Sequence, residues 1–97
     1  MKAYMLAFVR VSDLDTFNRE YIEKAVPIVK RHEGKTVAVD ENPTRIEGSV
    51  PEGRVVILEF PSKEAAKGFY NDPDYQSLKE WRKKVSKSDS IILQRGF

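Results

Sequence analysis

The sequence predicts an α+β domain in which two helices cover one face of a four-stranded antiparallel sheet. The first observation is the order of the elements, because segments of strand and helix character follow one another as strand, helix, strand, strand, helix, strand. The second is that no repeat, low-complexity run or long linker interrupts the chain, so we expect residues 1–97 to form a single domain. This order of elements is that of the ferredoxin-like fold.

The first strand and the first helix are predicted from a change in hydrophobic period. Residues 3–11 alternate in the manner of a strand, but both of their faces are apolar. Asp13 is suited to cap a helix, and apolar side chains, among them Tyr21, then recur at steps of three and four. We expect Pro27 to divide this helix into a main part and a final turn, and Gly34 to supply the left-handed residue at its end.

The middle of the chain is predicted to form two strands. β-Branched residues favour a strand over residues 35–39, and the polar residues 40–43 are typical of a turn. We expect residues 44–48 to form a short extension or return of this strand. The strongest strand signal is residues 54–60, where Glu59 is the only polar side chain inside a continuous apolar run. Such a run is typical of a strand that is covered on both faces.

The last third of the chain is predicted to be a helical region followed by a strand. Ser62 is placed to cap a helix, and Asp72 is placed to cap another that begins at Pro73. Apolar residues at helical spacing continue this second helix to Val85, and an apolar group inside residues 90–95 predicts the final strand.

The apolar character of both sheet faces predicts a homodimer. Two helices cover only one face of such a sheet. The other face would then expose Leu6, Phe8 and the aliphatic side chains of residues 54–60 as a large apolar patch, which is rare in soluble monomers. We therefore expect two copies of the chain to pack sheet against sheet about a two-fold axis.

Composition excludes several classes of site. The sequence contains no cysteine, which excludes disulfides, thiol catalysis and most structural zinc sites. A single histidine excludes a metal site built from two or three imidazoles, and the scattered glycines form no phosphate-binding loop. We therefore expect neither a metal nor a cofactor.

Charge and hydropathy argue against nucleic acid and membranes as partners. The formal net charge is only +2, and the third predicted strand carries aliphatic side chains where an RNA-recognition motif needs aromatic ones. We expect the N-terminal residues to form a buried strand rather than a signal peptide, and no stretch of the sequence approaches the ~20 apolar residues that span a bilayer. We expect a cytoplasmic protein.

Two blocks of sequence resemble the DUF1330 family. The first is residues 56–66, which include Glu-Phe-Pro-Ser, and the second is residues 69–76, which include Pro-Asp-Tyr-Gln; Arg82 follows. Residues 29–32 and Gly34 also match, and the resemblance covers essentially the whole chain. It departs at Glu33, where the family usually has a glycine, and at Leu14, where a proline often follows the capping Asp.

This resemblance implies a fold and an assembly more strongly than a reaction. The family belongs to the dimeric α/β-barrel superfamily, so the resemblance implies a homodimer of ferredoxin-like chains. Its own function is unknown. Relatives in the superfamily include cofactor-free monooxygenases, lactone isomerases and haem-dependent enzymes.

His32 is the first candidate for a catalytic residue. Histidine is the usual side chain for acid–base catalysis, and His32 lies at a predicted helix end and matches a position of the family. A general acid or base also needs a pocket and a second polar group to orient it. The alternative is that the ring caps the last carbonyls of the helix.

Five other residues are candidates for binding a substrate. Tyr70, Tyr75 and Arg82 surround the predicted break between two helices, where hydroxyls beside a guanidinium would bind an anionic or phenolic ligand. Arg54 and Glu47 would help to orient the substrate at the mouth of a pocket. The alternatives are that the tyrosines serve packing and that Glu47 is solvated.

Two functions stay open at this point. The first is a homodimeric protein with a pocket for a small organic molecule, acting as a cofactor-independent enzyme that uses His32 as acid or base. The second is a non-catalytic ligand-binding or stress-related dimer module. A pocket would discriminate between them, because without a cavity near His32 the binding site expected there largely fails.

Overall fold

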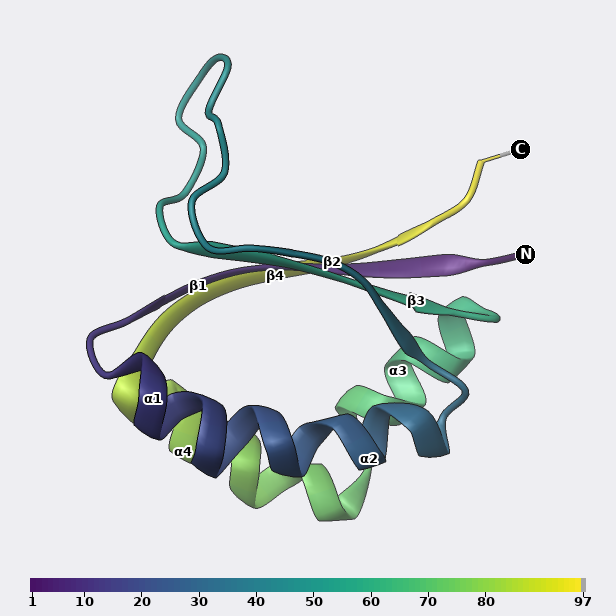
Figure 1. The fold of residues 1–97 in the computed structure, drawn as a ribbon. Coiled ribbons are helices and arrows are strands. Elements are labelled where there is room, and N and C mark those ends of the chain that lie inside the picture. The colour runs from purple at the N-terminus through teal and green to yellow at the C-terminus, as the bar shows by residue number, and fades with distance from the viewer. Residues whose placement is uncertain (97) are drawn as a thin grey trace.

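The computed structural model describes residues 1–96 and contains one four-stranded antiparallel sheet with the helices on one of its faces (Figure 1). The strands lie in the order β2-β3-β1-β4, so that the first and third strands occupy the centre. The predicted α+β, ferredoxin-like arrangement is confirmed. Its strands are β1 (Ala3–Val11), β2 (Lys35–Asp40), β3 (Arg54–Phe60) and β4 (Ser86–Gln94).

The register of the central strands explains their doubly apolar pattern. Met5 of β1 lies opposite Leu58 of β3, on the face that the helices cover, and Met5 is buried. The next residue, Leu6, lies opposite Ile57 of β3 and Ile91 of β4 on the other face. Among the described residues, no helix covers this second face (Figure 1).

The first helical segment consists of three parts in succession: α1 (Leu14–Phe17), the π-helical turn η1 (Asn18–Ile22) and α2 (Glu23–Arg31). Asp13 caps its start as predicted, accepting a hydrogen bond from the backbone N–H of Thr16 at 3.1 Å. The expected division at Pro27 is wrong, because α2 continues through this residue to Arg31. Pro27 has no backbone N–H that could donate to the Glu23 carbonyl. The helix departs from α geometry in the turn before Glu23.

The end of α2 also differs from the expectation. Glu33, not Gly34, adopts the left-handed conformation, with φ +62°. Its N–H donates to the Lys30 carbonyl and that of Gly34 to the Val29 carbonyl, both at 2.9 Å, which is the Schellman arrangement. Gly34 is required for space instead, since a Cβ there would lie 2.5 Å from the Phe60 ring.

The second strand and the following loop form the edge of the molecule. β2 pairs with β3 and has a register shift between Thr36 and Ala38. Residues 41–53 form no further strand, so the short return suggested by residues 44–48 is absent. This loop projects from the sheet on the side away from the helices (Figure 1).

The second helical segment consists of α3 (Lys63–Tyr70), the short 3₁₀ turn η2 (Pro73–Tyr75) and α4 (Gln76–Val85). The predicted caps are confirmed: Ser62 accepts from the N–H of Ala65 at 3.0 Å and Asp72 from that of Asp74 at 2.8 Å. β4 begins directly after α4 and therefore starts earlier than predicted. Within residues 1–96, none of the helices has the length and hydropathy to cross a membrane.

Candidate functional site

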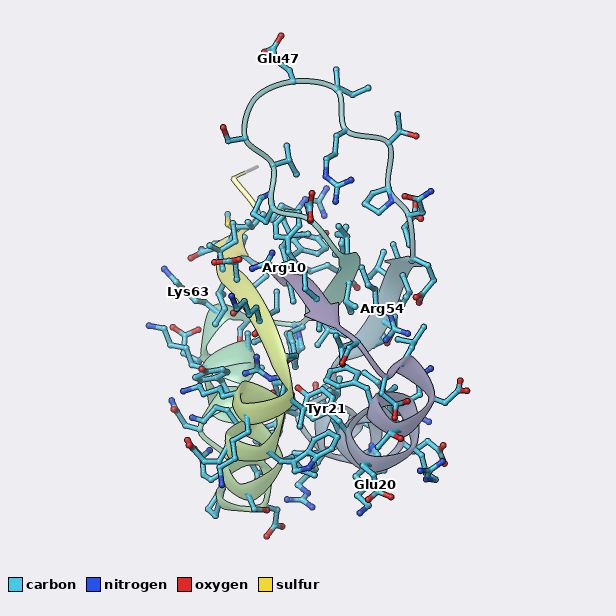
Figure 2. The ribbon with its side chains drawn as sticks, turned by 90° about the vertical axis from the view of Figure 1, so that its left-hand side faces the viewer. Arg10, Glu20, Tyr21, Glu47, Arg54 and Lys63 are labelled. Carbon is cyan, nitrogen blue, oxygen red and sulfur yellow. The ribbon has the colours of Figure 1, made fainter. Side chains whose placement is uncertain are left out.

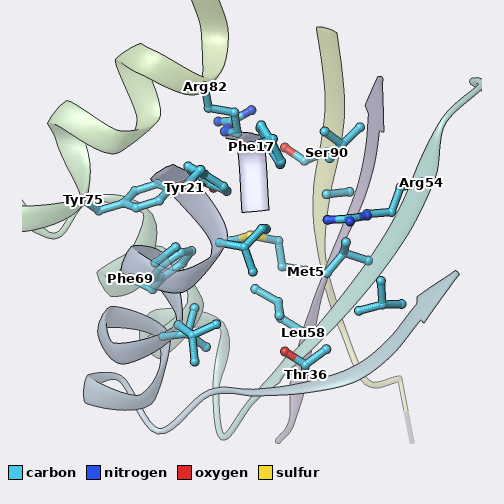
Figure 3. Close-up of a pocket in the computed structure, with 18 of the residues that line it drawn as sticks. Met5, Phe17, Tyr21, Thr36, Arg54, Leu58, Phe69, Tyr75, Arg82 and Ser90 are labelled. Carbon is cyan, nitrogen blue, oxygen red and sulfur yellow. Dashed lines mark hydrogen bonds between the residues drawn. The ribbon is translucent and has the colours of Figure 1, made fainter. Parts of the chain in front are cut away.

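A cavity of about 320 Å³ lies between the sheet and the helices (Figure 3). Its size is within the range of small-molecule sites, about 300–1,000 Å³. The walls are mostly aliphatic and aromatic and come from both layers of the fold. The aliphatic part includes Met5, Ala7, Ala25, Val29, Val56 and Leu58.

The π-helical turn η1 supplies part of one wall. Asn18, Tyr21 and Ile22 all line the cavity. Two of these residues, Tyr21 and Ile22, are neighbours in the sequence. Single π-helical turns within α-helices are frequent at functional sites.

Two tyrosines from different helices form the polar end of the cavity. The hydroxyls of Tyr21 and Tyr75 share a hydrogen bond, and both residues line the cavity. Burial and the neighbouring Tyr75 hydroxyl raise the pKa of Tyr21 far above its usual value of 10.0. Tyr21 is therefore a neutral hydrogen-bonding group at physiological pH rather than a base.

Arg82 of α4 lies beside this pair. Its guanidinium carbon is 5.8 Å from the centre of the Tyr21 ring, and Nη1 donates to Ser88 Oγ. Only 8% of the residue is exposed, and Nε is buried with no hydrogen-bond partner among the described residues. Burial lowers the pKa of Arg82, but the hydroxyl groups of Tyr75 and Tyr21 outweigh it and raise the pKa, so the group stays charged.

Arg54 of β3 lies on the sheet side of the cavity (Figure 3). Its Nε donates to Glu41 Oε1 at 2.6 Å, and Nη2 donates to Asn18 Oδ1 at 3.0 Å. The charge of Arg54 is thus matched by a carboxylate. Arg82, in contrast, forms no salt bridge with any residue in the described part of the chain.

The structure brings four of the six sequence-predicted site residues together. Arg54, Tyr70, Tyr75 and Arg82 all line the cavity. Glu47 does not, because it lies exposed at the far end of the projecting loop (Figure 2).

His32 also lies outside the cavity lining. Its Nε2 donates to Asp72 Oδ2 at 2.6 Å, and its Nδ1 lies against Gly68, where a Cβ would be only 3.1 Å away. Arg31 Nη1 also reaches Asp72, at 3.0 Å. The hydrogen bond from His32, the N–H of Asp74 and the Arg31 charge hold the pKa of Asp72 below its usual value.

These contacts join the end of α2 to the turn before η2. They occupy one imidazole nitrogen and place the other next to Gly68, which fits a packing role for His32. Within residues 1–96, no group of three histidine, aspartate or glutamate side chains is arranged to hold a metal ion.

Tyr21 is a polar residue of the cavity that the sequence reasoning missed. Its position on the apolar face of the first helix led to an interpretation as a packing residue. A signal was present, because a buried tyrosine hydroxyl usually has a hydrogen-bond partner. The partner, Tyr75, belongs to another helix, and the sequence does not show the register between the two.

Comparisons with solved structures show the same fold. The protein of unknown function RPA0582 from Rhodopseudomonas palustris is 23% identical over 97% of this chain and 82% of its own, with a TM-score of 0.73. SnoaB, a cofactor-independent oxygenase from Streptomyces nogalater, is 11% identical over 99% and 94%, with a TM-score of 0.68. A possible oxidoreductase from Bacteroides thetaiotaomicron is 14% identical over 97% of each chain, with a TM-score of 0.64.

At these identities the similarity shows the fold alone. None of the curated proteins matches the sequence. The model of one family, described as a domain of unknown function, DUF1330, matches residues 2–95. The chain therefore belongs to the DUF1330 family.

Proposed function

We propose that the protein binds a small, mostly apolar organic molecule in the cavity between the sheet and the helices. The observation that carries this proposal is the cavity itself, about 320 Å³ in volume and lined by side chains from every strand and from both helical segments. A packed interior rarely leaves a void larger than a water molecule. An apolar hollow with a few polar groups at one end is typical of ligand sites.

The lining supports binding more than proton abstraction. It contains no aspartate, glutamate or histidine among the described residues. His32 would act as acid or base only on a molecule that reached the end of α2, outside this cavity. Of the two functions left open by the sequence, ligand binding is therefore the one that the geometry favours.

We also propose that two copies of the chain pack through the open sheet face. Ile91 and Leu93 of β4 are 55% and 42% exposed on this face, next to Leu6 and Tyr4 of β1. The loop of residues 41–53 projects on the same side of the sheet, where it would flank a partner (Figure 1). Homodimer interfaces are typically rich in such exposed apolar surface.

The ligand proposal is tested with an uncharged two-ring probe, naphthalene-2-methanol, in a titration followed by NMR. For a probe of this size we expect saturable binding with a dissociation constant of about 0.1–1 mM. Ala7→Phe fills the cavity from β1 and should weaken binding by about tenfold or more. Val56→Phe fills it from β3 and serves as a second blocking variant.

The control is Val37→Phe, which adds the same ring on β2 at a residue that is 51% exposed and does not line the cavity. Its affinity should stay close to that of the natural chain. The proposal is wrong if the natural chain does not bind the probe, or if folded Ala7→Phe and Val56→Phe variants bind it as well as the control does.

A further inference from the structure

Arg82 presents a buried positive charge without a counter-ion in the described structure. The residue is 8% exposed, lines the cavity and leaves Nε without an acceptor. Burying an unpaired charge is costly, and proteins normally match it with a group of opposite sign. The contact with the Tyr21 ring supplies only part of this compensation. A bound anion next to Arg82 would supply the missing negative charge.

The tyrosine pair adds a second donor at the same end of the cavity. Each hydroxyl has one proton, and the bond between Tyr21 and Tyr75 uses only one of the two. The other proton has no acceptor in the described part of the chain. Figure 3 shows Arg82, Tyr21 and Tyr75 along the helical wall of the cavity. This end therefore offers an N–H and an O–H to the same occupant.

The rest of the lining defines what else the occupant must be. Within residues 1–96 it has no acidic side chain that would repel an anion, and the other arginine, Arg54, already has a carboxylate partner in Glu41. The remaining walls are aliphatic and aromatic, so that an inorganic anion would leave most of the volume unfilled.

We propose that the pocket selects an organic carboxylate, whose two oxygens accept hydrogen bonds from the Arg82 guanidinium and the tyrosine pair while its apolar body fills the cavity. This inference deepens the proposed ligand-binding function and rests on it. A carboxylate offers two acceptor oxygens in one plane, which suits a guanidinium N–H and a neighbouring hydroxyl.

The test compares two probes with the same ring system, 2-naphthoate and naphthalene-2-methanol, at neutral pH. We expect the natural chain to bind the carboxylate about tenfold or more tightly than the alcohol, because hydrogen bonds to charged groups are the stronger ones. In Arg82→Met the preference should fall to about threefold or less, while the alcohol still binds. Lys79→Met removes the same charge from α4 at a residue outside the cavity lining and should keep the preference.

A second readout does not depend on the fold of a variant. The Nε–H resonance of Arg82 in the natural chain should shift on addition of the carboxylate and not on addition of the alcohol. The variant Tyr21→Phe/Tyr75→Phe retains both rings and should lower the preference several-fold.

The outcomes separate the two proposals. If the alcohol binds and the carboxylate is not preferred, or if Lys79→Met loses the preference as Arg82→Met does, the carboxylate site is wrong and the ligand pocket stands. If neither probe binds, the ligand pocket itself is wrong and the carboxylate site falls with it.

Discussion

The hydroxyls of Tyr21 and Tyr75, which are 54 residues apart in the sequence, meet in one hydrogen bond at the polar end of the cavity. The bond connects the π-helical turn of the first helical segment to the 3₁₀ turn of the second. The same contact thus connects two irregular turns and keeps the Tyr21 hydroxyl, whose pKa is raised by burial, close to the charge of Arg82.

Removing one hydroxyl of this pair is expected to destabilise the chain. Tyr21→Phe and Tyr75→Phe should each lower the free energy of unfolding by about 1–2 kcal/mol, because each leaves a buried hydroxyl unpaired. The double variant should lose less than the sum of the two, which urea denaturation of all four proteins would show. Additive losses would mean that the two hydroxyls are not coupled.

The left-handed residue at the end of α2 offers a stabilising substitution. Glu33 has φ +62°, which is unfavourable for any residue with a Cβ, so Glu33→Gly should raise the free energy of unfolding by about 0.5–1 kcal/mol. Glu33→Ala keeps the Cβ and should give no such gain. Chemical denaturation of both variants checks the prediction, and an equal gain in the two would contradict it.

Asp72 is expected to contribute to loss of stability in acid. Its pKa is held below the ordinary 3.8, first by the hydrogen bond from His32. The stabilisation of the fold by the ionised Asp72 carboxylate is therefore complete above the pKa of the unfolded state. It is lost as the pH falls through the lower pKa of the folded state. Asp72→Asn should consequently lose less stability than the natural chain between about pH 6 and about pH 2.5.

The control for this experiment is Asp74→Asn, next to it in the same cluster. The Asp74 side chain also contacts Arg31 but is 69% exposed, so its substitution should change the acid dependence less. Urea midpoints at several pH values give the comparison. An Asp72→Asn slope identical to that of the natural chain would show that Asp72 has no such role.

A charge on the open sheet face should prevent the proposed dimer. Light scattering is expected to give about twice the 11.2 kDa chain mass for the natural protein and a single chain mass for Leu6→Glu. Val85→Glu places the same charge on a comparably apolar residue at the end of α4, 38% exposed, and should remain dimeric. A natural chain that is monomeric at high concentration would rule the dimer out.

Much of the fold was predictable because the spacing of apolar residues along the sequence indicates which side chains are buried. The central strands β1 and β3 and the capping residues Asp13, Ser62 and Asp72 depend on local sequence, and the structure confirms them. The π-helical turn was not predictable in this way. Its residues carry the same apolar spacing as an ordinary α-helix, and the geometry depends on how the whole segment packs.

The site was predictable only in part for a similar reason. Tyr75 and Arg82 are seven residues apart and fall on one face of the second helical segment, so their proximity follows from the sequence. The position of His32 relative to the cavity depends on the contact between α2 and the turn at Asp72, which joins residues 40 apart. No local pattern contains that information.

α4 ends at Val85 and β4 begins at the next residue, Ser86, so that no residue connects the two elements. The length of the helix therefore determines which face of the sheet each side chain of β4 lies on. One inserted residue would rotate the preceding helix by about 100° or invert every side chain of the strand. Either change would remove Arg82 from the cavity or exchange the two faces of β4. We therefore expect the fold to tolerate an inserted or deleted residue in the loop of residues 41–53 but not at this junction.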